Sequence, residues 1–280
     1  MQLRHAICSE IFGEQDLAQT CRTVHALGYR GLEVAPFTLA DSVDEIPPRQ
    51  RRQIRETIEG EGMVCSGIHW LLVKPRGLHL TTRDRTLREK SWSYLSRLID
   101  FCGDLGGHLM ILGSPQQRST RDGMTAQEAL GRLAEGLAEL APSARDREVT
   151  LLMEAVSSEE TDVVSTLAEA VEVVDRVSHS HVQTMFDCHN AADEGGDFLH
   201  LAERYWSRIR HVHVNEIDGR HPGTGDVDFE RLLRFLRGRD YEGWVSLEVF
   251  DFRAGGERIA RESISYLREI ESRLESASDH

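Results

Sequence analysis

The chain has 280 residues, enough for two average domains or one large α/β barrel. Hydrophobic residues make up 40% of it and charged residues 29%, as in ordinary globular proteins. The formal net charge of −14 argues against a nucleic-acid partner, because an acidic surface repels phosphates. Apolar runs are too short for a membrane span, and the polar N-terminus does not resemble a signal peptide. We therefore expect no membrane partner and a cytoplasmic location.

Short apolar segments alternate with longer amphipathic ones along the whole chain. The predicted strands are 5–10, 31–36, 64–71, 108–113, 149–155, 182–188, 209–215 and 244–250. The predicted helices are 14–27, 48–61, 84–105, 125–147, 161–177, 197–207, 228–238 and 256–273. Eight strand–helix units predict an α/β fold closed as a (β/α)8 TIM barrel, although a doubly wound open sheet also alternates in this way. No linker divides the chain, so we expect one domain over 1–280, with a polar C-terminal tail from about 271 that frays.

Four ligand-type side chains end consecutive strand-like runs in the second half of the chain: Glu154, Asp187, His213 and Glu248. In a barrel such ends converge on one mouth, and adjacent strands lie ~4.8 Å apart. One such carboxylate is usually just solvated, but four together predict a shared divalent cation that neutralises them. The oxygen-rich set favours Mn2+, with Mg2+, Co2+ or Zn2+ as alternatives. His211 lies deeper in its strand and is expected to be packed or hydrogen-bonded.

The chain resembles the xylose isomerase-like barrel superfamily, and within it the sugar phosphate isomerase/epimerase group that includes ketose 3-epimerases. The resemblance covers nearly the whole chain and is carried by GYRGLEVAPF (28–37), GIHWLL (67–72), LLMEAV (151–156), MFDCHN (185–190), HVHVNE (211–216), HPGTGDVDF (221–229) and WVSLEVF (244–250). It implies that Glu154, Asp187, His213 and Glu248 bind the metal. It also implies that Glu154 and Glu248 are the catalytic acid/base pair, one on each face of the substrate.

Some positions that contact substrate in the resembled epimerases differ in this chain. Glu160 matches a supporting polar position six residues after Glu154. The family's histidine three residues after the aspartate ligand is replaced by Asn190, with His189 one place earlier. The family's arginine six residues after the histidine ligand is replaced by Gly219, with Arg220 next to it. We expect these residues near the substrate, but the sugar itself does not follow from the family.

Further candidates lie at other strand ends. Glu33 can bind a sugar hydroxyl or pair with a base at the barrel mouth. His69 can bind a hydroxyl and Trp70 can stack on a sugar, although a satisfied histidine and a packed indole are equally good interpretations. Asn215 and Glu216 follow the histidine ligand and are expected to orient it or the substrate.

The predicted metal set suits proton abstraction next to a carbonyl, because a divalent cation stabilises the enediolate and two carboxylates can exchange the proton. The sequence therefore predicts a metal-dependent sugar epimerase or isomerase acting on a small-molecule carbohydrate, and it leaves a homo-oligomer open. A lyase or dehydratase acting on a keto-sugar, inosose or keto-glycoside is the alternative. An endonuclease IV-type phosphodiesterase needs more histidines, and a non-catalytic barrel should have lost a ligand. No GxGxxG follows the first strand, so no dinucleotide cofactor is expected.

Overall fold

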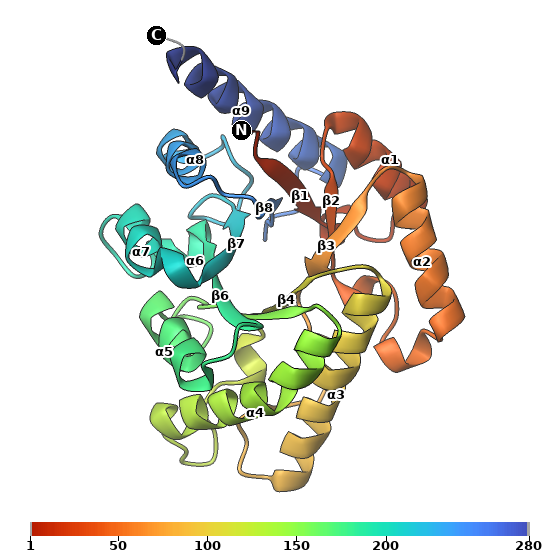
Figure 1. The fold of residues 1–280 in the computed structure, drawn as a ribbon, viewed down its shortest axis with the longest axis vertical. Coiled ribbons are helices and arrows are strands. Elements are labelled where there is room, and N and C mark those ends of the chain that lie inside the picture. Colours follow the sequence, from red (N-terminus) through yellow and green to blue (C-terminus); the bar gives the residue numbers. More distant parts are fainter. Residues whose placement is uncertain (1, 279–280) are drawn as a thin grey trace.

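Eight parallel strands close into a barrel in the computed structural model, which describes residues 2–278 (Figure 1). The strands follow one another around the barrel in chain order: β1 (Arg4–Cys8), β2 (Gly31–Val34), β3 (Val64–Ile68), β4 (Leu109–Leu112), β5 (Thr150–Met153), β6 (Val182–Asp187), β7 (Ile209–Val214) and β8 (Trp244–Leu247). The ring closes because β8 pairs with β1. The (β/α)8 TIM barrel is thus confirmed, and the open sheet is excluded.

Helices surround the barrel and alternate with the strands (Figure 1). They are α1 (Leu17–Leu27), α2 (Pro48–Gly60), α3 (Arg85–Asp104), α4 (Ala126–Asp146), α5 (Leu167–Val177), α6 (Cys188–Ala192), α7 (Phe198–Tyr205), α8 (Phe229–Gly238) and α9 (Gly256–Ser278). Several begin where a side chain accepts a free backbone N–H, as Asp84, Thr125 and Asp228 do. Within residues 2–278, no helix is long and apolar enough to cross a membrane.

The strands are buried on both faces, as parallel barrel strands usually are. Every residue of β2, β6 and β8 is buried. One large apolar cluster joins the first strands to the helices that cover them, and a second packs the C-terminal strands against α7, α8 and α9. With both faces covered, the carboxyl ends of the strands and the loops after them are the parts of the barrel available for a site.

Several element boundaries differ from the sequence prediction, and the differences affect the site. β5 ends at Met153 and β8 at Leu247, so Glu154 and Glu248 each lie one residue beyond their strand. β6 ends at Asp187, and the unpredicted helix α6 begins directly after it. The helix expected from 161 begins at Leu167, because the Thr166 side chain caps it by accepting from the N–H of Glu169.

The expected polar tail is wrong for the part of it that the structure describes. Residues 271–278 continue α9, and Glu271 and Leu274 are only 6% and 7% exposed. His5 at the start of β1 lies 2.8 Å from the Glu271 carboxylate through its Nε2 atom. These contacts pack the segment against the barrel, although its polar composition alone is typical of a frayed terminus. Residues 279–280 lie outside the described part of the chain.

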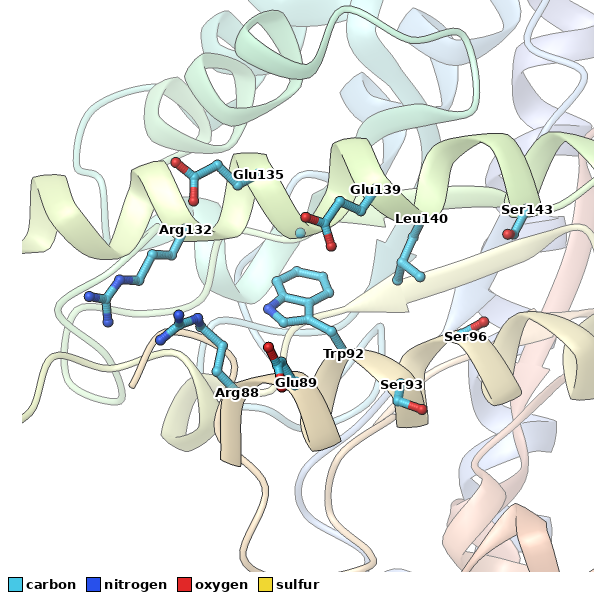
Figure 2. A pocket seen from close by; sticks show the side chains of 11 residues that line it. Arg88, Glu89, Trp92, Ser93, Ser96, Arg132, Glu135, Glu139, Leu140 and Ser143 are labelled. Carbon is cyan, nitrogen blue, oxygen red and sulfur yellow. The ribbon is translucent and has the colours of Figure 1, made fainter. Parts of the chain in front are cut away.

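A surface groove of about 540 Å³ runs between α3 and α4, on the outside of the barrel (Figure 2). Its base is the Trp92 indole, which donates from Nε1 to the carbonyl oxygen of Leu80 at 3.1 Å. The indole fits because residue 136 of α4 is glycine. A Cβ atom at Gly136 would lie 2.1 Å from Trp92 Cε2, far inside van der Waals contact.

We expect Gly136→Ala to destabilise the protein by about 1–3 kcal/mol, because the added methyl must displace the indole. Gly131→Ala in the same helix is the matched control, since a Cβ there meets nothing within 4 Å. That variant should be neutral or gain up to about 1 kcal/mol from helix propensity. Urea unfolding measures both, and an equal effect at the two positions would contradict the packing argument.

Candidate metal centre and active site

The four predicted ligands converge at the carboxyl ends of β5 to β8. Glu154, Asp187, His213 and Glu248 are all buried, and one ligand atom from each lies within 4.8 Å of the others. The His213 Nδ1 atom is 2.9 Å from Glu248 Oε2, 3.7 Å from Asp187 Oδ2 and 3.9 Å from Glu154 Oε1. The strand register contributes directly, because Asp187 and His213 are partners across β6 and β7. Non-adjacent parts of the chain thus form one compact donor set.

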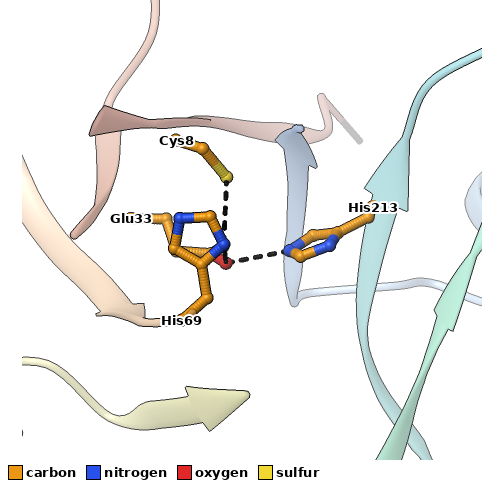
Figure 3. A group of neighbouring side chains, drawn as sticks. All are labelled: Cys8, Glu33, His69 and His213. Atoms are coloured by element: carbon orange, nitrogen blue, oxygen red, sulfur yellow. Dashed lines mark hydrogen bonds and ion pairs between the residues drawn. The ribbon is translucent and has the colours of Figure 1, made fainter. Parts of the chain in front are cut away.

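A buried carboxylate sets the orientation of the His213 imidazole. Glu33 at β2 has no exposed surface, and its two oxygens accept from His213 Nε2 and His211 Nε2, each at 2.8 Å. Figure 3 shows Glu33 together with His69 and His213. Burial alone would raise the pKa of Glu33, but the charges of His213 and His211 hold it well below its usual value. Glu33 is therefore paired with histidines, which is one of its two predicted roles, and His211 is hydrogen-bonded as expected.

The surroundings of the second ring nitrogen of His213, Nδ1, are the strongest sign that the four candidate ligands fit a cation. Although Nδ1 lies 2.9 Å from Glu248 Oε2, the geometry forms no hydrogen bond, and this buried atom has no hydrogen-bond partner among residues 2–278. Its surroundings are three carboxylates, which repel one another without a positive charge between them. A carboxylate behind one imidazole nitrogen and a free lone pair on the other is the usual arrangement of a metal-binding histidine. The donor set therefore fits a divalent ion.

Asp187 and Glu154 are held by groups from neighbouring segments. Asp187 ends β6 and also caps α6, because its Oδ1 accepts from the N–H of Asn190 at 2.7 Å. Its Oδ2 accepts from Asn215 Nδ2 at 3.0 Å, so Asn215 supports Asp187, whereas the sequence predicted that it would orient the histidine or the substrate. The main-chain oxygen of Glu154 accepts from Arg118 at 2.8 Å. The Asp187 carboxylate is thus held at both oxygens, and Glu154 is held through its main chain.

Arg118 is a residue that the sequence analysis missed. It has no exposed surface, and its guanidinium also donates to the carbonyl oxygens of Leu112 and Val164. It therefore ties the end of β4, the end of β5 and the loop before α5 together beneath Glu154. It lies in an irregular loop, where neither strand-end position nor spacing singles it out.

Glu248 is held from the opposite side by the end of β3. Trp70 Nε1 donates to its Oε1 at 2.8 Å, and His69 Nδ1 lies 3.2 Å from the same oxygen. His69 Nε2 lies 2.8 Å from Glu10 Oε2. Both ring nitrogens of His69 are engaged and only 1% of its surface is exposed, which favours the alternative of a satisfied histidine over a contact with a sugar hydroxyl. Glu10 was missed, although it ends the first predicted strand and the strand-end rule would have found it.

An aromatic rim flanks the donor set. The Trp70 ring is 5.8 Å from that of Phe37 and 6.4 Å from that of Phe250, and His189 lies 5.0 Å from Phe250. Phe250 is 40% exposed, so this row of rings reaches solvent. Its members follow β2, β3, β6 and β8. Trp70 and His189, both predicted near the substrate, thus lie on one rim, whereas Phe37 and Phe250 carried no sequence signal.

The remaining predicted substrate residues divide into near and distant ones. Asn190 Nδ2 lies 3.5 Å from Glu154 Oε1, so it adjoins the donor set. Glu216 does not face the mouth, because it is 1% exposed and accepts from the N–H groups of Gly223 and Val227. Arg220 pairs with Asp218 at 2.7 Å on the surface. The Glu160 side chain is exposed after β5 and has no described contact with the four ligands.

The fold and the buried donor set define a (β/α)8 barrel with a candidate metal centre, and comparison with known proteins identifies its family. The model of the xylose isomerase-like TIM barrel family matches residues 21–270, and the chain belongs to that family. It is 26% identical over 250 residues to a probable ketose 3-epimerase of Synechocystis sp., covering 84% of this chain and 80% of the relative. It is 26% identical over 270 residues to an inosose dehydratase of Clostridium perfringens, covering 85% and 84%. A crystal structure of D-psicose 3-epimerase superposes with a TM-score of 0.83 at 20% identity, covering 96% of this chain and 99% of that one.

Replacing the histidine ligand should remove the metal without unfolding the chain. We expect His213→Ala to lose most bound metal, with a stability loss of about 1–3 kcal/mol because Glu33 loses one partner. The exposed His200→Ala is the matched control and should keep full occupancy. Elemental analysis and circular dichroism measure the two effects. Full metal occupancy in folded His213→Ala would remove His213 from the ligand set.

Metal binding should also release protons. Burial and then the charge of Glu248 raise the pKa of Glu154 well above its usual value. Burial opposes the charged form of His213, but Glu33 and Glu248 hold its pKa well above 6.5. Both shifts favour the protonated form of the group, so an incoming ion must compete with protons for these side chains. Apparent metal affinity should then rise with pH.

Titration calorimetry with Mn2+ in buffers of different ionisation enthalpy measures this proton release. The apparent binding enthalpy should change with the buffer in proportion to the protons released. An enthalpy independent of the buffer would contradict the protonation states assigned to Glu154 and His213.

Proposed function

We propose that this chain is a divalent-metal-dependent sugar epimerase or isomerase that acts by proton transfer next to a carbonyl. The observation that supports it most is the buried donor set, in which two carboxylates, Glu154 and Glu248, flank the aspartate and histidine ligands. Similarity to a probable ketose 3-epimerase over most of the chain supports the same reaction class. The donor set suits Mn2+ first, with Mg2+, Co2+ or Zn2+ as alternatives.

Glu154 and Glu248 are suited to be the acid/base pair. They follow β5 and β8, and β6 and β7 lie between them in the ring, so the carboxylates approach the centre from different sides. Removal of a proton by one and its return by the other on the opposite face gives epimerisation, whereas return to the neighbouring carbon gives isomerisation. A bound divalent ion supplies the positive charge that stabilises the enediolate formed by proton removal.

The aromatic rim and its polar neighbours suit a small-molecule carbohydrate. The faces of Trp70 and Phe250 can pack against the C–H groups of a sugar. Asn190, which already adjoins Glu154, and His189 can bond to its hydroxyls. Neither Glu160 nor Arg220 contacts the donor set, so we assign them no role at the reacting carbon.

A lyase or dehydratase is the second candidate, because the chain shares 26% identity with the inosose dehydratase as well as with the probable ketose 3-epimerase. Two differences from the epimerase pattern also favour it. Asn190 takes the place of a histidine, and Gly219 takes the place of an arginine. At Gly219 the backbone φ is +76°, and a Cβ there would lie 3.1 Å from Phe250 Cβ, so a larger side chain is strained and crowded. If a leaving group stands next to the carbanion, the same proton abstraction leads to elimination.

Nuclear magnetic resonance in D2O tests the function directly. Metal-loaded protein with ketoses, inososes and keto-glycosides should exchange one carbon-bound hydrogen for deuterium, while polyols without a carbonyl stay unchanged. Loss of water or of an aglycone would establish the lyase. Cleavage of a phosphodiester, or dependence on NAD, would overturn proton abstraction as the shared step.

Glu154→Gln and Glu248→Gln should each lower turnover by about 10²–10⁴-fold while some metal binding remains. The amide oxygen can still coordinate an ion, but it cannot carry the proton. Glu159→Gln is the matched control, since Glu159 is exposed in the loop after β5. Deuterium exchange on the parent's substrate gives the rates, and near-parental exchange in Glu248→Gln would refute its role.

A further inference from the structure

The two oxygens of Glu248 have different surroundings. Oε2 faces the His213 Nδ1 atom at 2.9 Å and belongs to the donor set. Oε1 has two nitrogen neighbours from the end of β3, Trp70 Nε1 at 2.8 Å and His69 Nδ1 at 3.2 Å. A carboxylate held in this way has one oxygen hydrogen-bonded to protein donors and would have the other available to an ion.

Glu10 supports this arrangement from behind. It lies in the short 3-10 helix after β1, is 7% exposed, and its Oε2 is 2.8 Å from His69 Nε2. Its other oxygen is buried and has no hydrogen-bond partner in the described chain. A buried carboxylate is costly, and replacing a buried ion pair by apolar groups is often neutral for stability. Folding alone therefore does not explain an acidic residue at this position.

The Trp70 backbone adds a second and independent observation. Its φ is +52°, a left-handed value that is unusual for a bulky residue. Such a conformation persists where the surroundings hold it, and it is frequent at functional sites. Here it carries the indole nitrogen to Glu248, with the ring between Phe37 and Phe250.

A second ion shared by Glu10, His69 and Glu248 is the competing explanation, because single ligand atoms of the three lie within 4.8 Å of one another. The contacts argue against it. Glu10 faces Nε2 of His69 and Glu248 faces Nδ1, so the imidazole ring itself bridges the two carboxylates. An ion cannot occupy both edges of one ring. The arrangement is a chain of hydrogen-bonding groups.

We propose that Glu10, His69 and Trp70 are positioning residues that select the oxygen of Glu248 facing the reacting centre. Glu10 acts through His69, and neither of these two buried side chains reaches the mouth. His69 and Trp70 engage Oε1 as donors, which would leave Oε2 as the oxygen available to an ion. The proposal rests on the proposed function in one respect, the use of Glu248 as a ligand and acid/base group.

The test compares Glu10→Ala with Glu10→Gln, whose amide oxygen can still accept from His69 Nε2. We expect Glu10→Ala to keep one Mn2+ per chain but to lower kcat by about 10- to 100-fold, because Glu248 becomes misplaced. KM should change by no more than about twofold, since the loss is in the transition state. Glu10→Gln should recover most of kcat. The exposed Glu14→Ala is the matched control and should behave as the parent.

Electron paramagnetic resonance of the Mn2+-loaded protein gives a readout that needs no substrate. The zero-field splitting of Mn2+ should change in Glu10→Ala. It should also change in Trp70→Phe, which removes the indole donor but keeps an aromatic ring. In Glu10→Gln it should match the parent. If the spectra change in this way but no sugar exchanges a hydrogen with solvent, the positioning role of the three residues is supported and the proposed function is rejected. Three results would overturn the proposed positioning role. They are an unchanged spectrum in Glu10→Ala, an equal loss of kcat in Glu10→Gln and Glu10→Ala, and a parent protein that binds no Mn2+.

Discussion

Burial of negative charge at the mouth of the barrel is the constraint on which the rest of the site depends. Glu33, Glu154, Asp187 and Glu248 are each no more than 8% exposed, and isolated buried carboxylates are strongly unfavourable. Glu33 is compensated by two histidines and forms the base of the site. The other three lie around the Nδ1 atom of His213, which has no hydrogen-bond partner among the described residues, and a cation or protons would relieve their mutual repulsion. The folded chain thus presents a buried, negatively charged set of side chains that suits a cation.

The barrel meets this constraint by drawing support from nearly every strand end. Residues from β1, β2 and β3 stand behind His213 and Glu248, while Arg118 after β4 and the helix cap after β6 hold Glu154 and Asp187. The ligands themselves come only from the last four strands. The first half of the chain thus positions groups that the second half supplies. The donor set is therefore held by hydrogen bonds from neighbouring segments, although its members lie in loops or at strand ends.

The residues suited to set the reaction class and the substrate are different from the buried carboxylates. The relatives of this chain include a probable ketose 3-epimerase and an inosose dehydratase, so the shared fold does not fix the reaction. The aromatic rim of Phe37, Trp70, His189 and Phe250 reaches solvent at Phe250, whereas the carboxylates are buried. Gly219, which takes the place of the arginine of the resembled epimerases, adjoins Phe250. Specificity can therefore change there without disturbing the buried charges.

The sequence by itself predicted the barrel and brought out the four candidate ligands, because both predictions rest on local patterns. Alternating apolar and amphipathic segments encode strand and helix directly, and a charged residue at the end of an apolar strand is visible without any neighbour. Only the tertiary structure decided that the four candidates lie together, that Glu33 and His69 pair with protein groups, that Glu216 organises a loop, and that Arg118 and Glu10 adjoin the site. Each of these roles depends on partners up to 180 positions away in the chain, as Glu33 and His213 are. A side chain's type fixes which bonds it can make, but the groups that surround it after folding fix which bonds it does make.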